Sequence, residues 1–128
     1  MFATASEKGT LIRVFSIAEK KLIKELRRGT NECQVLSLSF SQDNSKIACT
    51  SDHGTLHVFS LKTKGDDENV VENKRSNLKF LGGVSKYFDS EWSYAKFSIG
   101  CNSSICRFVS NDKIVVLGAD ASYYRLRL

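Results

Sequence analysis

Two adjacent arginines, Arg27 and Arg28, have the residue type and spacing in this sequence that best fit a chemical function. They end an alternating stretch that predicts a β-strand, and successive side chains on a strand point to opposite faces, so each arginine can serve a different side. A guanidinium group forms bidentate hydrogen bonds with phosphate or carboxylate groups. Two neighbouring arginines alone are most often a solvated strand end, so their surroundings must decide between the two interpretations.

A sequence repeat supplies those surroundings. Residues 3–16, ATASEKGTLIRVFS, align with residues 48–60, ACTSDHGTLHVFS, with one residue skipped in the second copy. Each copy offers small polar or basic side chains that can complete an anion site, although threonine also suits a strand without any ligand. The repeat therefore predicts two anion sites: Arg27 with Ser6, Thr10 and Arg13, and Arg28 with Ser51, Thr55 and His57.

The spacing of the copies predicts the fold. Their offset is 45 residues before the gap and 44 after it, and blades of WD-repeat β-propellers recur every ~40–45 residues. A weaker third copy, residues 113–128, aligns with residues 46–61 at an offset of 67, which indicates an insertion. Alternation and turn residues predict strands at 3–5, 10–16, 21–26, 34–40, 46–50, 55–61, 94–98, 105–110, 113–117 and 122–128.

We therefore expect an all-β fragment of a propeller, with about two and two-thirds blades. Residues 1–30 would end one blade, residues 31–98 would form the next with an inserted loop at 62–93, and residues 99–128 would form most of a third. Unpaired strand edges readily pair with other chains, so we predict a piece of a longer protein or an oligomer that closes through these edges.

The insertion contains a stretch suited to a membrane surface. Residues 74–88, KRSNLKFLGGVSKYF, interleave basic and apolar side chains without a single acid until residue 89. Bases near an anionic leaflet and shallowly inserted apolar side chains both favour membrane binding. The expected membrane-insertion residues are Lys74, Arg75, Leu78, Lys79, Phe80, Leu81, Tyr87 and Phe88. The alternative is that the aromatic side chains pack the loop onto the propeller, which we expect for Trp92, Tyr94 and Phe97.

Composition narrows the class of partner. The net charge of +5 and a pI near 9.1 favour an anionic partner: a membrane, a nucleic acid or an acidic protein surface. The four cysteines form no CxxC pair, and no nucleotide-binding glycine loop or pairing of histidine with an acid is evident. We expect a binding protein without catalytic residues, cofactor or metal. The sequence has neither a long apolar run nor a secretory signal, which predicts a cytoplasmic location.

The residues around the arginine pair also resemble a known family. The segment LRRG at 26–29, between the two copies of the repeat, is similar to the F/LRRG signature of the phosphoinositide-binding PROPPIN (WIPI-type) family, in its LRRG subgroup. The resemblance implies blades five to seven of a seven-bladed propeller. It also implies two sites for phosphatidylinositol 3-phosphate or 3,5-bisphosphate, formed by the two residue sets above, and a membrane-inserting loop in blade six.

The family further implies recruitment to autophagosomal or endosomal membranes as a peripheral membrane protein, with autophagy proteins as partners by analogy. The resemblance leaves the choice between the 3-phosphate and the 3,5-bisphosphate open. The rival interpretation is an interaction propeller that binds acidic peptides through its basic rim; nucleic acid is the less favoured partner. Twin anion sites beside a basic, aromatic loop favour the lipid.

Overall fold

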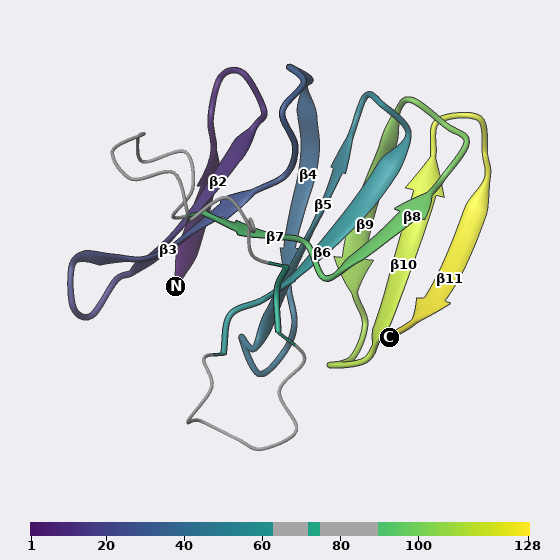
Figure 1. Cartoon of the computed structure of the whole chain (residues 1–128). Coiled ribbons are helices and arrows are strands. Elements are labelled where there is room, and N and C mark those ends of the chain that lie inside the picture. Colours follow the sequence, from purple (N-terminus) through teal and green to yellow (C-terminus); the bar gives the residue numbers. More distant parts are fainter. Residues whose placement is uncertain (63–71, 75–89) are drawn as a thin grey trace.

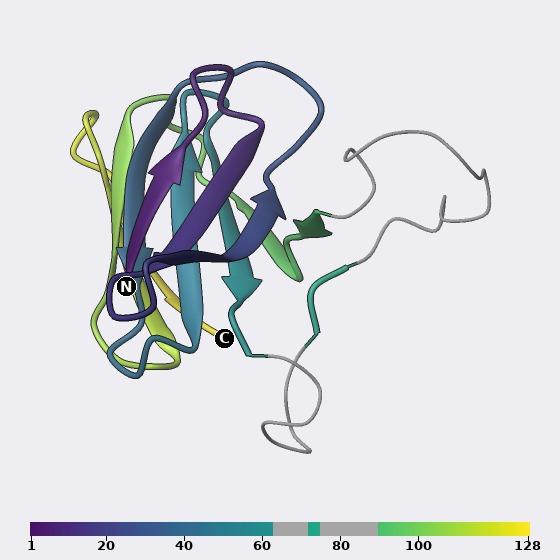
Figure 2. The same cartoon turned by 90° about the vertical axis from the view of Figure 1, so that its left-hand side faces the viewer.

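The computed structural model describes residues 1–62, 72–74 and 90–128. In these residues eleven strands form three sheets, and there is no helix, so none that could span a bilayer. The sheets follow one another in chain order from left to right in Figure 1, and Figure 2 shows the first in front of the other two. Their faces pack together through two hydrophobic clusters. The predicted all-β fold is confirmed.

Each sheet is an antiparallel meander, and the first sheet also has one short parallel strand. The first sheet has the order β1 (Phe2–Ala5), β2 (Leu11–Ser16), β3 (Lys21–Arg27) and β7 (Glu91–Trp92). The second contains β4 (Val35–Phe40), β5 (Lys46–Ser51), β6 (Thr55–Ser60) and β8 (Ala95–Ser98), and the third contains β9 (Ser104–Phe108), β10 (Lys113–Gly118) and β11 (Tyr123–Arg127). The parallel strand is β7, which pairs with β3.

Side-chain alternation explains how the sheets stack. On β2, Ile12 and Val14 are fully buried while Arg13 between them is exposed, as a strand with one covered face requires. The middle sheet is covered on both faces, so β5 and β6 are buried at five of six positions each. One cluster joins the first and second sheets and the other joins the second and third.

Glycine makes the repeated hairpin turns. Gly9 and Gly54 occupy equivalent positions of the repeat and have φ values of 64° and 62°, which other residues rarely adopt. A Cβ atom on Gly9 would also lie 2.0 Å from the carbonyl oxygen of Cys33. The turn before β2 therefore packs closely against the segment that follows Arg28.

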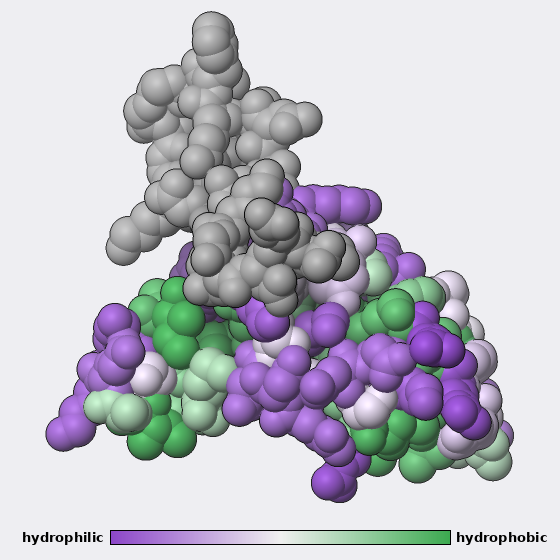
Figure 3. All heavy atoms as spheres, turned by 90° about the horizontal axis from the view of Figure 1, so that it is seen from below, coloured by the Kyte–Doolittle hydropathy of each residue, from purple (hydrophilic) through white to green (hydrophobic). Residues whose placement is uncertain are grey.

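Both ends of the row of sheets expose hydrophobic side chains. Phe2 and Leu22 are exposed on the first sheet, and Ile105, Leu117 and Tyr123 are exposed on neighbouring strands of the third. Figure 3, which shows the molecule from below, has hydrophobic surface toward both ends and polar residues between them. The expectation that further blades or a second copy cover these ends stays a prediction.

All ten predicted strands are present, with bounds that differ by one or two residues. The strand that was not predicted is β7, because two residues are too few to show alternation. Tyr94 and Phe97 pack against the core between the second and third sheets, as expected. The division into blades five, six and seven stays a prediction.

Candidate anion-binding site

A pocket of about 590 Å³ opens beside Arg28, where the first and second sheets meet. Its described lining comes from the segment after β3, from the β5–β6 turn with β6, from Lys74 within the insertion, and from the stretch that runs from β7 to β8 and begins at the end of the insertion. The lining residues are Arg28, Gly29, Thr30, Asn31, His53, His57, Lys74, Trp92, Ser93 and Lys96. Among the described residues these include three fixed cations and two histidines but no carboxylate, so this lining attracts anions.

Arg28 is held in place by backbone carbonyl groups. Its Nε donates to Gly9 O at 2.7 Å, and its guanidinium also donates to Asn31 O. Its backbone N–H donates to Thr10 O at 2.9 Å. Arg28 as a whole residue is only 5% exposed, and these two side-chain hydrogen bonds use two of its five N–H donors. The glycine turn of the first repeat thus orients Arg28 toward the pocket and leaves other donors for an anion.

His57 contributes a neutral imidazole to the same pocket. Its Nδ1 lies 3.1 Å from Ser93 Oγ, and its buried Nε2 has no hydrogen-bond partner among the described residues. Burial, followed by the positive charges of Lys96 and Arg28, lowers the pKa of His57 to about 4. The ring is therefore uncharged near neutral pH, and a bound anion would favour its protonated form.

The structure brings together only part of the predicted second set. Arg28 and His57 share the pocket, whereas Ser51 and Thr55 are not among its lining residues. The latter two pair in register across the β5–β6 hairpin, with their hydroxyl oxygens 3.3 Å apart. A ligand role for Ser51 and Thr55 stays a prediction.

Sequence reasoning missed several residues of this pocket. His53 belongs to neither predicted set; it lies in the turn before Gly54 and lines the pocket. Lys96 is the register partner of His57 on the neighbouring strand, which an alignment of the last strand with β6 could have indicated. Trp92 and Ser93 carry no such signal, because their position depends on the path of the insertion.

The predicted first set lies on and beside the first sheet. Leu26 is buried in the cluster facing the second sheet, so Arg27, the next residue on β3, points to the opposite face. Arg27 is buried and lies opposite Leu11 and Trp92 in register. Arg28 follows the last residue of β3, and the expectation that the two arginines serve anion sites on different sides of the sheet stays a prediction.

The other members of the first set have partners in the protein. Ser6 Oγ accepts a hydrogen bond from Leu11 N at 3.1 Å, and Thr10 O accepts one from the backbone of Arg28. Arg13 is exposed, and its Nε donates to Glu25 Oε2 at 2.9 Å. Anion binding by this set stays a prediction.

Of the expected membrane-insertion residues, Lys74 alone belongs to the described part of the chain, and it lines the pocket. The others lie outside the described residues: Arg75, Leu78, Lys79, Phe80, Leu81, Tyr87 and Phe88. Among the described residues, no group of three histidine, cysteine or acidic side chains is placed to hold a metal ion.

Comparison with known proteins identifies the family. The family model described as PROPPIN matches residues 1–99 of this chain. The chain belongs to the PROPPIN family. SVP1-like protein 2 of Kluyveromyces lactis is 39% identical over 121 residues, which cover 91% of this chain and 34% of that protein. Autophagy-related protein 18e of Arabidopsis thaliana is 32% identical over 130 residues, covering 99% of this chain and 34% of that protein.

Solved structures support the same assignment. Hsv2p of Kluyveromyces lactis has a TM-score of 0.68 and 28% identity, and the match covers 92% of this PROPPIN chain and 34% of that one. A second structure, Kluyveromyces lactis Hsv2 with complete loop 6CD, has a TM-score of 0.67 and 29% identity over 98% of this chain and 42% of that one. These likenesses confirm the predicted β-propeller fragment. The chain spans about a third of the length of the relatives it matches.

Proposed function

We propose that this PROPPIN chain binds the phosphorylated inositol head group of a membrane lipid in the pocket beside Arg28, and does so without catalysing a reaction. The observation that carries the proposal is the convergence of Arg28, Lys74 and Lys96 with two histidines around one pocket. A phosphate monoester carries a charge of about −1.5 to −2 near neutral pH, and fixed cations form strong charge-assisted hydrogen bonds with it.

The shape of the site also supports a compact ligand. A pocket of about 590 Å³ falls in the size range of small-molecule sites. An inositol ring with one or two phosphates fits this range, whereas an extended acidic peptide needs a groove along a sheet edge or between elements. The head groups proposed are those of phosphatidylinositol 3-phosphate and phosphatidylinositol 3,5-bisphosphate.

Membrane attachment would combine several weak contacts. The pocket beside Arg28, the predicted site of Arg27 and the basic, apolar stretch at 74–88 would face one membrane, and linked weak contacts strengthen each other through effective concentration. Names of relatives such as autophagy-related protein 18e support a role in autophagy. The chain would then act in the cytoplasm as a peripheral protein of autophagosomal or endosomal membranes and bring autophagy proteins to them.

Liposome co-sedimentation tests this proposal. Vesicles of phosphatidylcholine alone are compared with vesicles that also contain phosphatidylinositol 3-phosphate, the 3,5-bisphosphate or the isomeric 4-phosphate. We expect binding that requires a 3-phosphorylated lipid, is lost in Arg28→Thr and is weakened in Lys96→Gln. Lys96 is exposed, so its replacement leaves the fold intact even if Arg28→Thr disturbs the Gly9 turn.

Arg107→Thr is the matched control, because Arg107 is an exposed arginine of β9 outside the pocket lining. Binding that ignores the lipid, or that survives both pocket substitutions, would refute the proposal. Displacement of the chain from vesicles by an acidic peptide, but not by a soluble inositol phosphate, would favour the peptide-binding alternative.

A further inference from the structure

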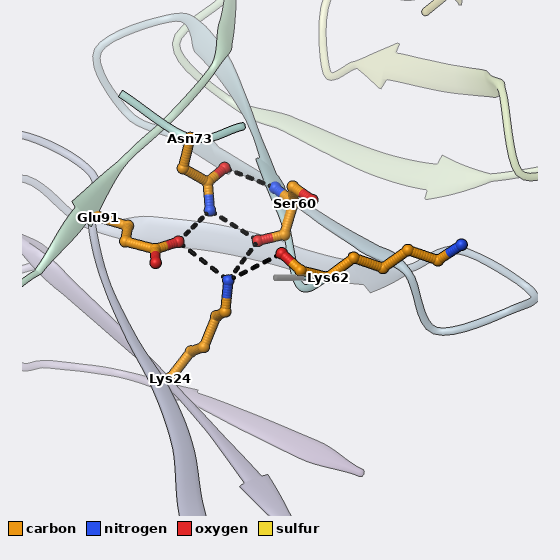
Figure 4. Close-up of polar contacts among 5 residues, drawn as sticks. All are labelled: Lys24, Ser60, Lys62, Asn73 and Glu91. Carbon is orange, nitrogen blue, oxygen red and sulfur yellow. Dashed lines mark hydrogen bonds and ion pairs between the residues drawn. The ribbon is translucent and has the colours of Figure 1, made fainter. Parts of the chain in front are cut away.

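A partly buried polar cluster joins the first and second sheets to the base of the insertion, next to the pocket but outside its lining (Figure 4). Lys24 Nζ on β3 forms an ion pair with Glu91 Oε2 on β7 at 3.0 Å. The same ammonium group donates to Lys62 O at 3.2 Å and Ser60 O at 3.5 Å. One lysine of the first sheet thereby contacts the chain both where it enters the insertion and where it leaves.

Asn73 closes this cluster from within the insertion. Its Oδ1 accepts a hydrogen bond from Ser60 N at 2.6 Å, and its Nδ2 donates to Ser60 O at 2.6 Å. Nδ2 also lies 2.7 Å from Glu91 Oε2. The side-chain amide thus mimics a strand partner for the last residue of β6 while it contacts the carboxylate that Lys24 holds.

Burial gives these contacts more weight than a surface ion pair has. The Lys24 side chain is 9% exposed, the Glu91 side chain is 22% exposed, and Asn73 is buried. An exposed pair contributes little, but removal of one partner from a shielded pair costs more. Truncation of Lys24 should therefore weaken the contacts that hold Glu91 and the chain that carries it.

A change in the position of this chain would reach the pocket directly. Asn73 precedes Lys74 and Glu91 precedes Trp92, and both following residues line the pocket. Lys74 and Trp92 also form an antiparallel bridge in which Trp92 N donates to Lys74 O at 2.7 Å. In addition, β7 pairs with Leu26 and Arg27, immediately before Arg28. The cluster therefore sets where the outer wall of the pocket lies relative to Arg28.

We infer that Lys24, Asn73 and Glu91 are positioning residues that fix the base of the insertion and thereby preorganise the anion-binding pocket. This inference rests on the proposed function. None of the three lines the pocket, so each acts through Lys74 and Trp92 and not on the ligand. The insertion then has a second role besides membrane contact, because its base supplies one wall of the head-group site.

The expected effect follows from the population of the anchored form. If loss of the Lys24 ammonium lowers that population to about a tenth, the apparent affinity for the head group falls about tenfold. The fold should survive, because the two hydrophobic clusters hold the sheets together without Lys24.

Calorimetric titration with the water-soluble dibutanoyl form of phosphatidylinositol 3-phosphate tests the inference, because this probe reports the pocket without a membrane. The variants are Lys24→Met, which keeps the length of the side chain, and the milder Glu91→Gln. The matched control is Lys21→Met: Lys21 is on the same strand and pairs with Glu19, but its side chain is 64% exposed. We expect about tenfold weaker binding in Lys24→Met, weaker binding in Glu91→Gln and unchanged binding in the control.

Trp92 is the one tryptophan of the chain, so tryptophan fluorescence reports on this residue alone. It provides a second readout, which would not change if the cluster only stabilised the fold. The fluorescence emission of Trp92 should shift to longer wavelength in Lys24→Met while the circular dichroism of the sheets is retained. Variants that keep full affinity, or that lose it only by losing the sheets, would overturn the inference. Absence of binding by the unmodified chain would instead refute the proposed function and the inference with it.

Discussion

Acidification from pH 7 to pH 5 should destabilise this chain mainly through His57. Burial, together with the charges of Lys96 and Arg28, lowers the pKa of this histidine from 6.5 to about 4. A histidine with a lowered folded-state pKa is neutral in the folded chain but takes up a proton in the unfolded chain. Stability is therefore present above pH 6.5 and is lost as the pH falls from 6.5 toward 4.

The two pKa values set the size of the effect. At pH 5 the histidine is almost fully protonated in the unfolded chain, and this protonation stabilises the unfolded chain. The folded chain binds little proton at His57 and is stabilised little. The difference lowers the free energy of unfolding by about 2 kcal/mol relative to pH 7. Asp43, Asp112 and Asp120 also have lowered pKa values, but they lose their contribution only below about 3.8, outside this range.

Urea unfolding at pH 7, 6 and 5, followed by circular dichroism, measures this loss. His57→Gln removes the titrating group and should unfold with nearly the same free energy at all three pH values. Ser93→Ala is the control, because it removes the hydrogen-bond partner of His57 and leaves the imidazole in place. An equal loss of stability in the unmodified chain and in His57→Gln would refute the assigned cause.

Three further predictions concern the turn, the core and the pocket. Gly9→Ala should lower the free energy of unfolding by more than about 1 kcal/mol, because Gly9 has a positive φ and lies close to the Cys33 carbonyl group. Gly29 has open space around it, so Gly29→Ala should be nearly neutral in the same urea titration. Leu56→Ala should cost about 2–5 kcal/mol in denaturant unfolding, since Leu56 is fully buried in the double-sided middle sheet; a smaller cost would mean that the cluster collapses around the cavity. Calorimetric affinity for dibutanoyl phosphatidylinositol 3-phosphate should fall as salt rises, and Lys96→Gln should reduce that dependence; an affinity indifferent to salt would argue against cationic recognition.

Local pattern determined most of the strand arrangement. The two copies ATASEKGTLIRVFS and ACTSDHGTLHVFS contain strand, glycine turn and strand in the same order, so each specifies its own hairpin from residues close in sequence. These features need only short-range geometry, and they were predicted with bounds close to those observed.

The tertiary structure alone decided the walls of the pocket. Lys96 meets His57 through the register of β8 on β6, and Trp92 meets Lys74 through a bridge between two residues of the insertion that are distant in sequence. The same holds for Lys24, whose partner Glu91 is 67 residues away. The sequence by itself determined the repeated hairpins and the arginine pair, because strand periodicity and turn chemistry are local. Which side chains share a site with Arg28 was decided by packing and strand register, which depend on the whole arrangement of sheets.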